Sequence, residues 1–299
     1  MATRIISSSE GINRGPFSVK DWGLFLSVAL IWGSSFLFIS IALADFAPGL
    51  ITWLRVGSGA ATLAFVPRAR KPVLREDWPK LMALSFLWVA IPFTLFPLAQ
   101  QYINSAVTGM LNGATPIFAA LFASLLLKRW PRIAQAGGLV LGLAGLALIS
   151  ISTGGQGDTA WYGVVMVLVA TLCYGISINI AAGLQQKYGA LPIMSRMLVL
   201  ATVWVSPFGI ISLSESSFSL AAFGSVLFIG VAGTGLAFLI MGTLSGSVGP
   251  TRASFITYLI PVVSVVLGVV FLSDQVTTLA LVGIALVIFG AILASRREQ

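Results

Sequence analysis

The chain has 299 residues, of which 58% are hydrophobic and only 9% are charged. Soluble domains carry about 25% charged residues, so this composition excludes an ordinary soluble domain. The net charge of +8 does not indicate nucleic-acid binding either, because the basic residues lie in short connectors between apolar runs. The chain has no histidine and a single cysteine, which excludes a disulfide framework and a Cys/His metal site.

Apolar runs long enough to cross about 30 Å of hydrocarbon recur from residue 22 to residue 294. Breaks at proline, glycine and charge clusters predict ten transmembrane helices after a cytoplasmic N-terminal tail at residues 1–20. The predicted helices span residues 22–44, 49–66, 79–101, 105–127, 133–152, 161–183, 192–213, 219–243, 251–272 and 277–294. The sequence therefore predicts an all-α polytopic membrane protein.

The charges of the connectors alternate along the chain. With the N-terminus in the cytoplasm, 15 of the 17 basic residues fall in inner segments, and the outer loops hold none. The outer loops instead hold Asp45, Asp158, Glu215 and Asp274. This distribution follows the positive-inside rule, so both termini are predicted to be cytoplasmic. For a bacterial protein, the expected location is the inner (plasma) membrane.

The two halves of the chain show similar patterns. The stretches GMLNGATPIFAALFASLLL and SFITYLIPVVSVVLGVVFL superimpose Pro116 on Pro261, and WGSSF resembles YGISI at an offset of 142 residues. Because each half has five predicted helices, an odd number, the second half must cross the membrane in the opposite direction. We therefore predict a five-plus-five inverted repeat, with residues 21–152 as the first copy and 160–296 as the second. Such repeats are typical of secondary transporters.

Several short motifs, taken together, indicate a family. WGSSF in the first helix, Arg55 early in the second, Ala253 eight residues before Pro261 and glycine-rich fifth and tenth helices resemble the drug/metabolite transporter superfamily. The closest resemblance is to its ten-helix inner-membrane exporters of aromatic or other amino acids and metabolites, over residues 21–296. The resemblance implies export through a central cavity, with the fifth and tenth helices supporting two moving bundles.

The first half of the fourth predicted helix carries polar side chains on one face. Thr108, Asn112 and Thr115 follow one another at i, i+4 and i+7. An unpaired polar group in hydrocarbon costs several kcal/mol, so this face is expected to meet other helices or a water-filled cavity. The repeat aligns Asn112 with Thr257, beside Tyr258. We predict that these residues line a substrate cavity, with hydrogen bonding between helices as the alternative.

Other predicted helices carry aromatic rings beside short polar side chains. This combination suits a zwitterionic substrate with a variable side chain, although ordinary packing or exposure to lipid is the alternative. The further candidates for the cavity are Trp32, Ser34, Ser35 and Phe38 in the first helix, Phe93 and Gln101 in the third, Tyr174 and Asn179 in the sixth, and Phe238 in the eighth.

Prolines and arginines inside the predicted helices are candidates for moving parts. Pro116 and Pro261 remove backbone hydrogen bonds, so they are predicted to bend their helices, with a passive kink as the alternative. Arg55 and Arg196 are the only charged residues that lie more than one residue inside the predicted spans. Either one could act as a gate or as an anchor for a carboxylate. The alternative is an arginine that snorkels to the membrane surface.

The residues that are absent from the predicted spans narrow the function. No acidic residue lies well inside a span, which disfavours proton antiport through a buried carboxylate. The spans offer no catalytic pair, nucleotide-binding loop or metal ligands, so neither an enzyme nor a cofactor is expected. We expect a secondary transporter that exports amino acids or related metabolites by alternating access. The alternatives are a channel or facilitator for drugs, nucleotide sugars or other amphipathic solutes, and a non-transporting scaffold. The expected partners are the substrate and the lipid bilayer, and the expected state is a monomer or weak dimer.

Overall fold

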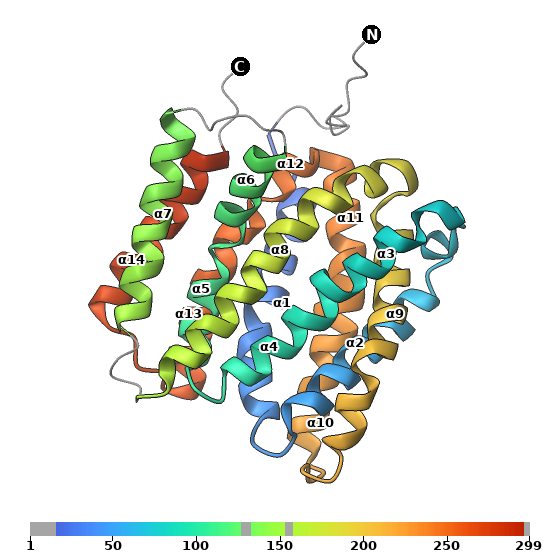
Figure 1. Ribbon diagram of the computed structural model, residues 1–299, viewed down its shortest axis with the longest axis horizontal. Coiled ribbons are helices and arrows are strands. Elements are labelled where there is room, and N and C mark those ends of the chain that lie inside the picture. The colour runs from blue at the N-terminus through green and yellow to red at the C-terminus, as the bar shows by residue number, and fades with distance from the viewer. Residues whose placement is uncertain (1–15, 127–132, 153–157, 296–299) are drawn as a thin grey trace.

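The computed structural model describes residues 16–126, 133–152 and 158–295, and within these ranges the chain forms helices and no strands (Figure 1). Seven of the described helices are long and apolar enough to cross a membrane, and two shorter apolar helices lie near the C-terminus. The chain is therefore all-helical, as its composition predicts, with the character of a polytopic membrane protein. Most of the predicted tail at residues 1–20 and the basic connector at residues 127–132 lie outside the described residues.

Helices lie close to where the apolar runs predict them, but several are divided. In the first half the helices are α1 (Val19–Ala42), α2 (Pro48–Ala64), α3 (Trp78–Leu84), α4 (Ile91–Ala99), α5 (Ser105–Asn112), α6 (Thr115–Leu126) and α7 (Ile133–Ser152). In the second half they are α8 (Ala160–Tyr188), α9 (Ala190–Ile211), α10 (Leu220–Gly230), α11 (Ala237–Val248), α12 (Pro250–Ala253), α13 (Ile256–Leu272) and α14 (Thr278–Ser295). The third and eighth predicted helices are continuous spans at Arg75–Ala99 and Leu220–Val248, and only the fourth and ninth are interrupted by turns.

The fourth predicted helix is interrupted just before its proline. Pro116 has no N–H, so it cannot donate to the carbonyl of Asn112 four residues earlier. The chain turns at residues 113–114, between α5 and α6. The Thr115 hydroxyl donates to the Asn112 carbonyl over 2.9 Å and replaces the missing bond. In the ninth predicted helix the interruption lies at residues 254–255, and Pro261 lies inside α13.

The third and eighth predicted helices each contain a π-helical segment. One joins α3 to α4 at Ser85–Ala90, and the other joins α10 to α11 at Val231–Leu236. A π-helical turn inserts one residue into an α-helix, and such turns often occur at functional sites. The two segments occupy matching helices of the predicted repeats.

The fifth and tenth predicted helices, α7 and α14, pair at one edge of the molecule (Figure 1). A Cβ atom on Gly290 would lie 2.5 Å from the backbone nitrogen of Gly142, and one on Gly145 would lie 2.5 Å from the carbonyl oxygen of Gly283. The two backbones therefore approach each other where neither helix has a side chain. These glycines therefore allow α7 and α14 to pack closely.

Candidate functional site

Arg55 lies at the junction of four helical elements. It extends from α2 and is only 6% exposed. Its guanidinium carbon lies 4.0 Å from the centroid of the Phe93 ring on α4, and its Nε donates to the Thr234 hydroxyl over 3.4 Å. The ring of Tyr174 on α8 packs on that of Phe96 on α4, three residues after Phe93, with 6.0 Å between centroids. The junction therefore joins α2 and α4 of the first half to α8 and the second π-helical segment.

This junction lies deep within the helices. Tyr174 is halfway along α8, and Thr234 is halfway along the apolar segment Leu220–Val248. A snorkelling arginine would instead lie at a helix end with its head exposed. Arg55 is buried and bonded to interior partners, so the snorkelling alternative is wrong for this residue.

A proline in α4 leaves the carbonyl of Phe93 without its usual backbone donor. Pro97 has no N–H to offer the carbonyl of Phe93, four residues before it in α4. The hydroxyl of Thr52 on α2 lies 3.0 Å from this carbonyl and 2.9 Å from the carbonyl of Pro48, so its proton serves both. Thr52 is fully buried. This contact fixes the Phe93 segment against α2, one turn before Arg55.

The second π-helical segment is stabilised by side chains around it. The Trp32 indole N–H donates to the Gly233 carbonyl over 3.0 Å, and the Thr234 hydroxyl donates to the Ile229 carbonyl over 3.0 Å. The Trp32 ring meets the Phe238 ring edge to face, with 5.7 Å between centroids. The predicted cavity residues Trp32 and Phe238 therefore lie together, next to the element that contacts Arg55.

The other candidates of α1 pack beside this segment. The hydroxyls of Ser34 and Ser35 both donate to the carbonyl of Ile31, over 3.0 and 3.2 Å, so they satisfy a group of their own helix. A Cβ on Gly233 would lie 3.4 Å from the Ser35 oxygen, which places this side chain near the π-helical segment. Phe38 packs on Phe228, with 4.3 Å between ring centroids.

The polar residues of the fourth predicted helix have different surroundings. Thr108 is fully buried, and its hydroxyl donates to the carbonyl of Asn104. Thr115 is engaged with the carbonyl that Pro116 leaves free. The Asn112 Oδ1 atom is buried, and no described residue donates a hydrogen bond to it. Of the three, Asn112 alone keeps an unused polar atom in this part of the described chain.

Three further predicted cavity residues form hydrogen bonds with backbone carbonyls and not with Arg55. The Tyr258 hydroxyl donates to the Ala291 carbonyl on α14, and the Thr257 hydroxyl donates to the Ser254 carbonyl of its own turn. The Asn179 amide donates to carbonyls of α6 and α8, over 2.9 and 2.8 Å. These bonds are the interhelical and local contacts that formed the alternative to cavity lining.

Sequence reasoning selected the wrong glutamine of a pair. Gln101 is exposed in the turn after α4. The inward side chain is Gln100, whose Oε1 accepts a hydrogen bond from Ser40 and whose Nε2 is buried without a described partner. Gln100 follows Phe96 by four residues, and Phe96 contacts the ring of Tyr174. This helical spacing is the signal that could have identified Gln100.

Two hydroxyl residues near the junction were also missed as site candidates. Thr234 and Thr52 gave no signal of their own in the sequence pattern. Ser177 is fully buried, and its hydroxyl has no partner among the described residues. It follows Tyr174 by three residues, so both lie on the same face of α8.

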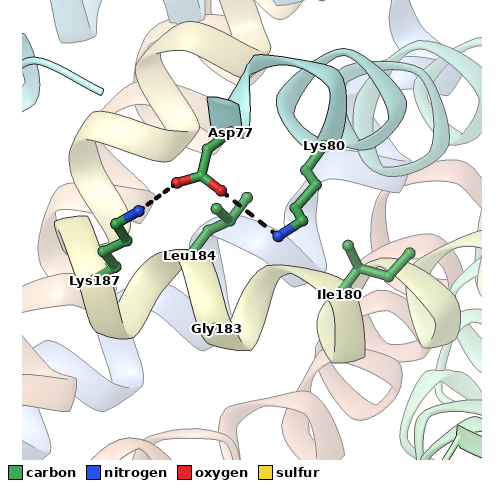
Figure 2. A pocket seen from close by; sticks show the side chains of 6 residues that line it. All are labelled: Asp77, Lys80, Ile180, Gly183, Leu184 and Lys187. Atoms are coloured by element: carbon green, nitrogen blue, oxygen red, sulfur yellow. Dashed lines mark hydrogen bonds and ion pairs between the residues drawn. The ribbon is translucent and has the colours of Figure 1, made fainter. Parts of the chain in front are cut away.

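A second polar cluster joins the start of α3 to the end of α8 (Figure 2). Lys187 forms ion pairs with Asp77 at 2.8 Å and Glu76 at 3.0 Å, and Lys80 lies 3.6 Å from Asp77. The Tyr188 hydroxyl donates to Asp77 over 2.7 Å. With Ile180, Gly183 and Leu184, the two lysines and Asp77 line an open cavity of about 340 Å³.

A matching contact lies at the other end of the molecule. The Ser219 hydroxyl at the start of α10 donates to the Asp45 carboxylate over 2.6 Å, and the Ser217 N–H donates to the Asp45 carbonyl over 2.9 Å. At the offset of 142 residues that superimposes WGSSF on YGISI, Asp45 corresponds to Lys187 and Asp77 corresponds to Ser219. Two contacts that are related in the sequence thus tie opposite ends of the helices.

Arg196 differs from Arg55. Its Nη1 donates to the carbonyls of Ala69 and Pro192, over 3.1 and 2.9 Å, so the guanidinium holds the connector after α2 against α9. This position, near the start of α9, favours the snorkelling alternative for Arg196 over the binding of a carboxylate. Among the described residues, no group of three or more His, Cys, Asp or Glu lies together in a way that could hold a metal ion.

Known proteins resemble this chain over nearly its whole length. The model of the EamA-like transporter family matches it twice, at residues 22–151 and 161–296. An uncharacterized transporter of Archaeoglobus fulgidus is 25% identical over 94% of the chain and 100% of the relative. A probable terminal-alkyne amino-acid exporter of Streptantibioticus cattleyicolor is 25% identical over 92% of the chain and 93% of the relative. The inner membrane transporter YedA of Escherichia coli K12 is 24% identical over 92% of the chain and 90% of the relative. One crystal structure covers 93% of the chain and 97% of its own, with a TM-score of 0.64 at 18% identity, and so shows a shared fold.

Proposed function

The chain belongs to the EamA-like transporter family, and from this membership we propose that it is a secondary transporter exporting amino acids or related small metabolites. The observation that carries the proposal is the buried polar junction around Arg55, built from α2 and α4 of one half and α8 and the π-helical segment of the other. Transporters with internal repeats bind substrates near the midplane where their halves meet. The resemblance to a probable amino-acid exporter supports amino acids as the leading substrate class.

The proposed architecture is a five-plus-five inverted repeat in the inner membrane, with both termini cytoplasmic. Two separate matches to the family model support it, each covering one proposed copy. The two π-helical segments and the two related end contacts support it as well. A monomer or weak dimer is the proposed state, with α7 and α14 as supports.

Alternating access gives the two end contacts a function. In the proposed cycle, the contact between Asp77 and Lys187 opens when the site faces the cytoplasm, and the contact between Asp45 and Ser219 opens when it faces outward. The contacts join the two halves of the chain, so relative motion of the halves would break one and preserve the other.

Reconstitution into liposomes tests the function. Vesicles loaded with unlabelled amino acids are expected to accumulate labelled amino acid from outside by counterflow, and uptake is expected to saturate. A channel would not support counterflow and would give single-channel currents instead. Absence of counterflow for every common amino acid, in vesicles shown to contain folded protein, would reject amino-acid transport.

A further inference from the structure

We propose that Arg55 binds the carboxylate group of the transported solute, an inference that rests on the proposed transport function. Arg55 is the only charged side chain that the structure shows at the central junction within the described residues. A binding role there would define the substrate class, because it requires a solute that carries a carboxylate group.

The charge of Arg55 is not neutralised by the protein. None of the carboxylates in the described ranges forms an ion pair with it, whereas Lys187 has two acidic partners. An arginine without a counter-charge at the middle of a membrane helix is energetically costly. Its only described hydrogen bond is the long one to Thr234, at 3.4 Å. A bound anion would supply the missing partner.

The orientation of the Arg55 guanidinium leaves its terminal N–H groups available to bind a ligand. Phe93 lies against the guanidinium with its ring centroid 4.0 Å from the central carbon, which uses the π-face of the cation. The N–H groups lie in the guanidinium plane, where they suit the two oxygens of a carboxylate. Among the described residues, neither terminal nitrogen of Arg55 donates a hydrogen bond. These nitrogens form the proposed contact.

The surroundings favour a monoanion over a phosphate. The junction offers one positive charge beside the aromatic rings of Phe93 and Tyr174. A carboxylate pairs with that charge one to one, whereas a phosphate dianion brings a second negative charge for which the junction offers no partner. The hydroxyls of Ser177 and Tyr174, on one face of α8, provide uncharged polar groups for the rest of the solute.

The test compares each common amino acid with its amide, which lacks the carboxylate charge. Wild type, Arg55→Gln, Arg55→Lys and the control Arg196→Gln are reconstituted for counterflow, and their thermal unfolding in detergent is measured with both ligands and with inorganic phosphate. In wild type the acid is expected to compete with labelled amino acid and the amide is not. Arg55→Gln is expected to raise KM for the acid about 10- to 100-fold and to abolish the preference for acid over amide. Arg196→Gln is expected to keep the preference.

The possible results separate this inference from the proposed function. Counterflow with an unchanged preference in folded Arg55→Gln would overturn the role of Arg55 and leave transport intact. If Arg55→Gln does not fold, the preference for acid over amide is measured in Arg55→Lys instead. This variant keeps the charge but loses the planar pair of donors. If wild type carries no amino acid, amino-acid export fails, and phenylacetate is compared with phenylacetamide by thermal unfolding. Stabilisation by phenylacetate that depends on Arg55 would support the inference, whereas equal effects, or a larger effect of phosphate, would overturn it.

Discussion

Lys187 at the end of α8 reaches Asp77 at the start of α3 over 2.8 Å, and thereby joins one half of the chain to the other. The Asp77 side chain is only 8% exposed and accepts from Tyr188 as well, whereas the side chain of Glu76 is 69% exposed. Asp77 is therefore the centre of this contact, and Glu76 lies at its edge.

Asp77→Asn is expected to weaken the contact between α3 and α8. The substitution removes the charge that both Lys187 and Lys80 approach, so the midpoint of thermal unfolding in detergent should fall. Glu76→Gln is the matched control, and it should have a smaller effect because exposed ion pairs contribute little. Equal shifts in the two variants would show that Asp77 has no special part in holding this end.

Because α7 packs closely on α14, alanine substitutions at two glycines are expected to have opposite effects on stability. Gly290→Ala places a Cβ 2.5 Å from the backbone of Gly142, where neither backbone can yield without separating the helices. The expected loss of stability is about 1–3 kcal/mol, as for other overpacked sites. Gly137→Ala is the control, since nothing lies within 4 Å of its added Cβ and alanine favours helix. Thermal unfolding of the purified proteins checks the pair, and similar midpoints would contradict the packing observed here.

The positions of the helices could be predicted from the sequence, but their interruptions could not. Apolar runs and charged connectors determine where a chain can cross a bilayer, and these features are local. The π-helical segments depend on bonds such as the one from Trp32 to Gly233, between residues far apart in the chain. The helix is interrupted just before Pro116, yet α13 continues without interruption through Pro261. Local signals therefore do not decide the course of a buried helix.

The residue types of the candidate site could be predicted from the sequence better than the directions in which the side chains point. Trp32, Phe93, Tyr174 and Phe238 were selected as aromatic neighbours of polar groups, and the structure brings them near Arg55 or its contacting segment. The choice of Gln101 failed because α4 ends at Ala99, so Gln101 lies in the following turn and is exposed. Asn112 as a cavity residue stays a prediction.

Transport is expected to proceed without a pH gradient. The described residues around Arg55 include no carboxylate, and the chain has no histidine, so the junction offers no group that titrates near neutral pH. Counterflow into proteoliposomes should therefore continue at the same rate after a proton ionophore collapses an imposed pH gradient. Strict dependence of flux on that gradient would show proton coupling.

Thr52 and Pro97 are expected to be coupled through the carbonyl of Phe93. Thr52→Val removes the hydroxyl that this buried carbonyl accepts from, and an unsatisfied buried acceptor costs about 1–3 kcal/mol. Thr52→Ser keeps the donor and should cost less. Pro97→Ala restores a backbone N–H four residues after Phe93, where it can donate to the same carbonyl.

A double-mutant cycle measures this coupling. Thr52→Val in the Pro97→Ala background should destabilise less than Thr52→Val alone, because the carbonyl then has a second donor. Thermal unfolding gives the stability term, and KM for a transported amino acid reports whether Phe93 keeps its place against Arg55. Additive effects of the two substitutions would mean that the Thr52 hydroxyl does not compensate for the proline. In that case its bond to Pro48 within α2 would be its main one.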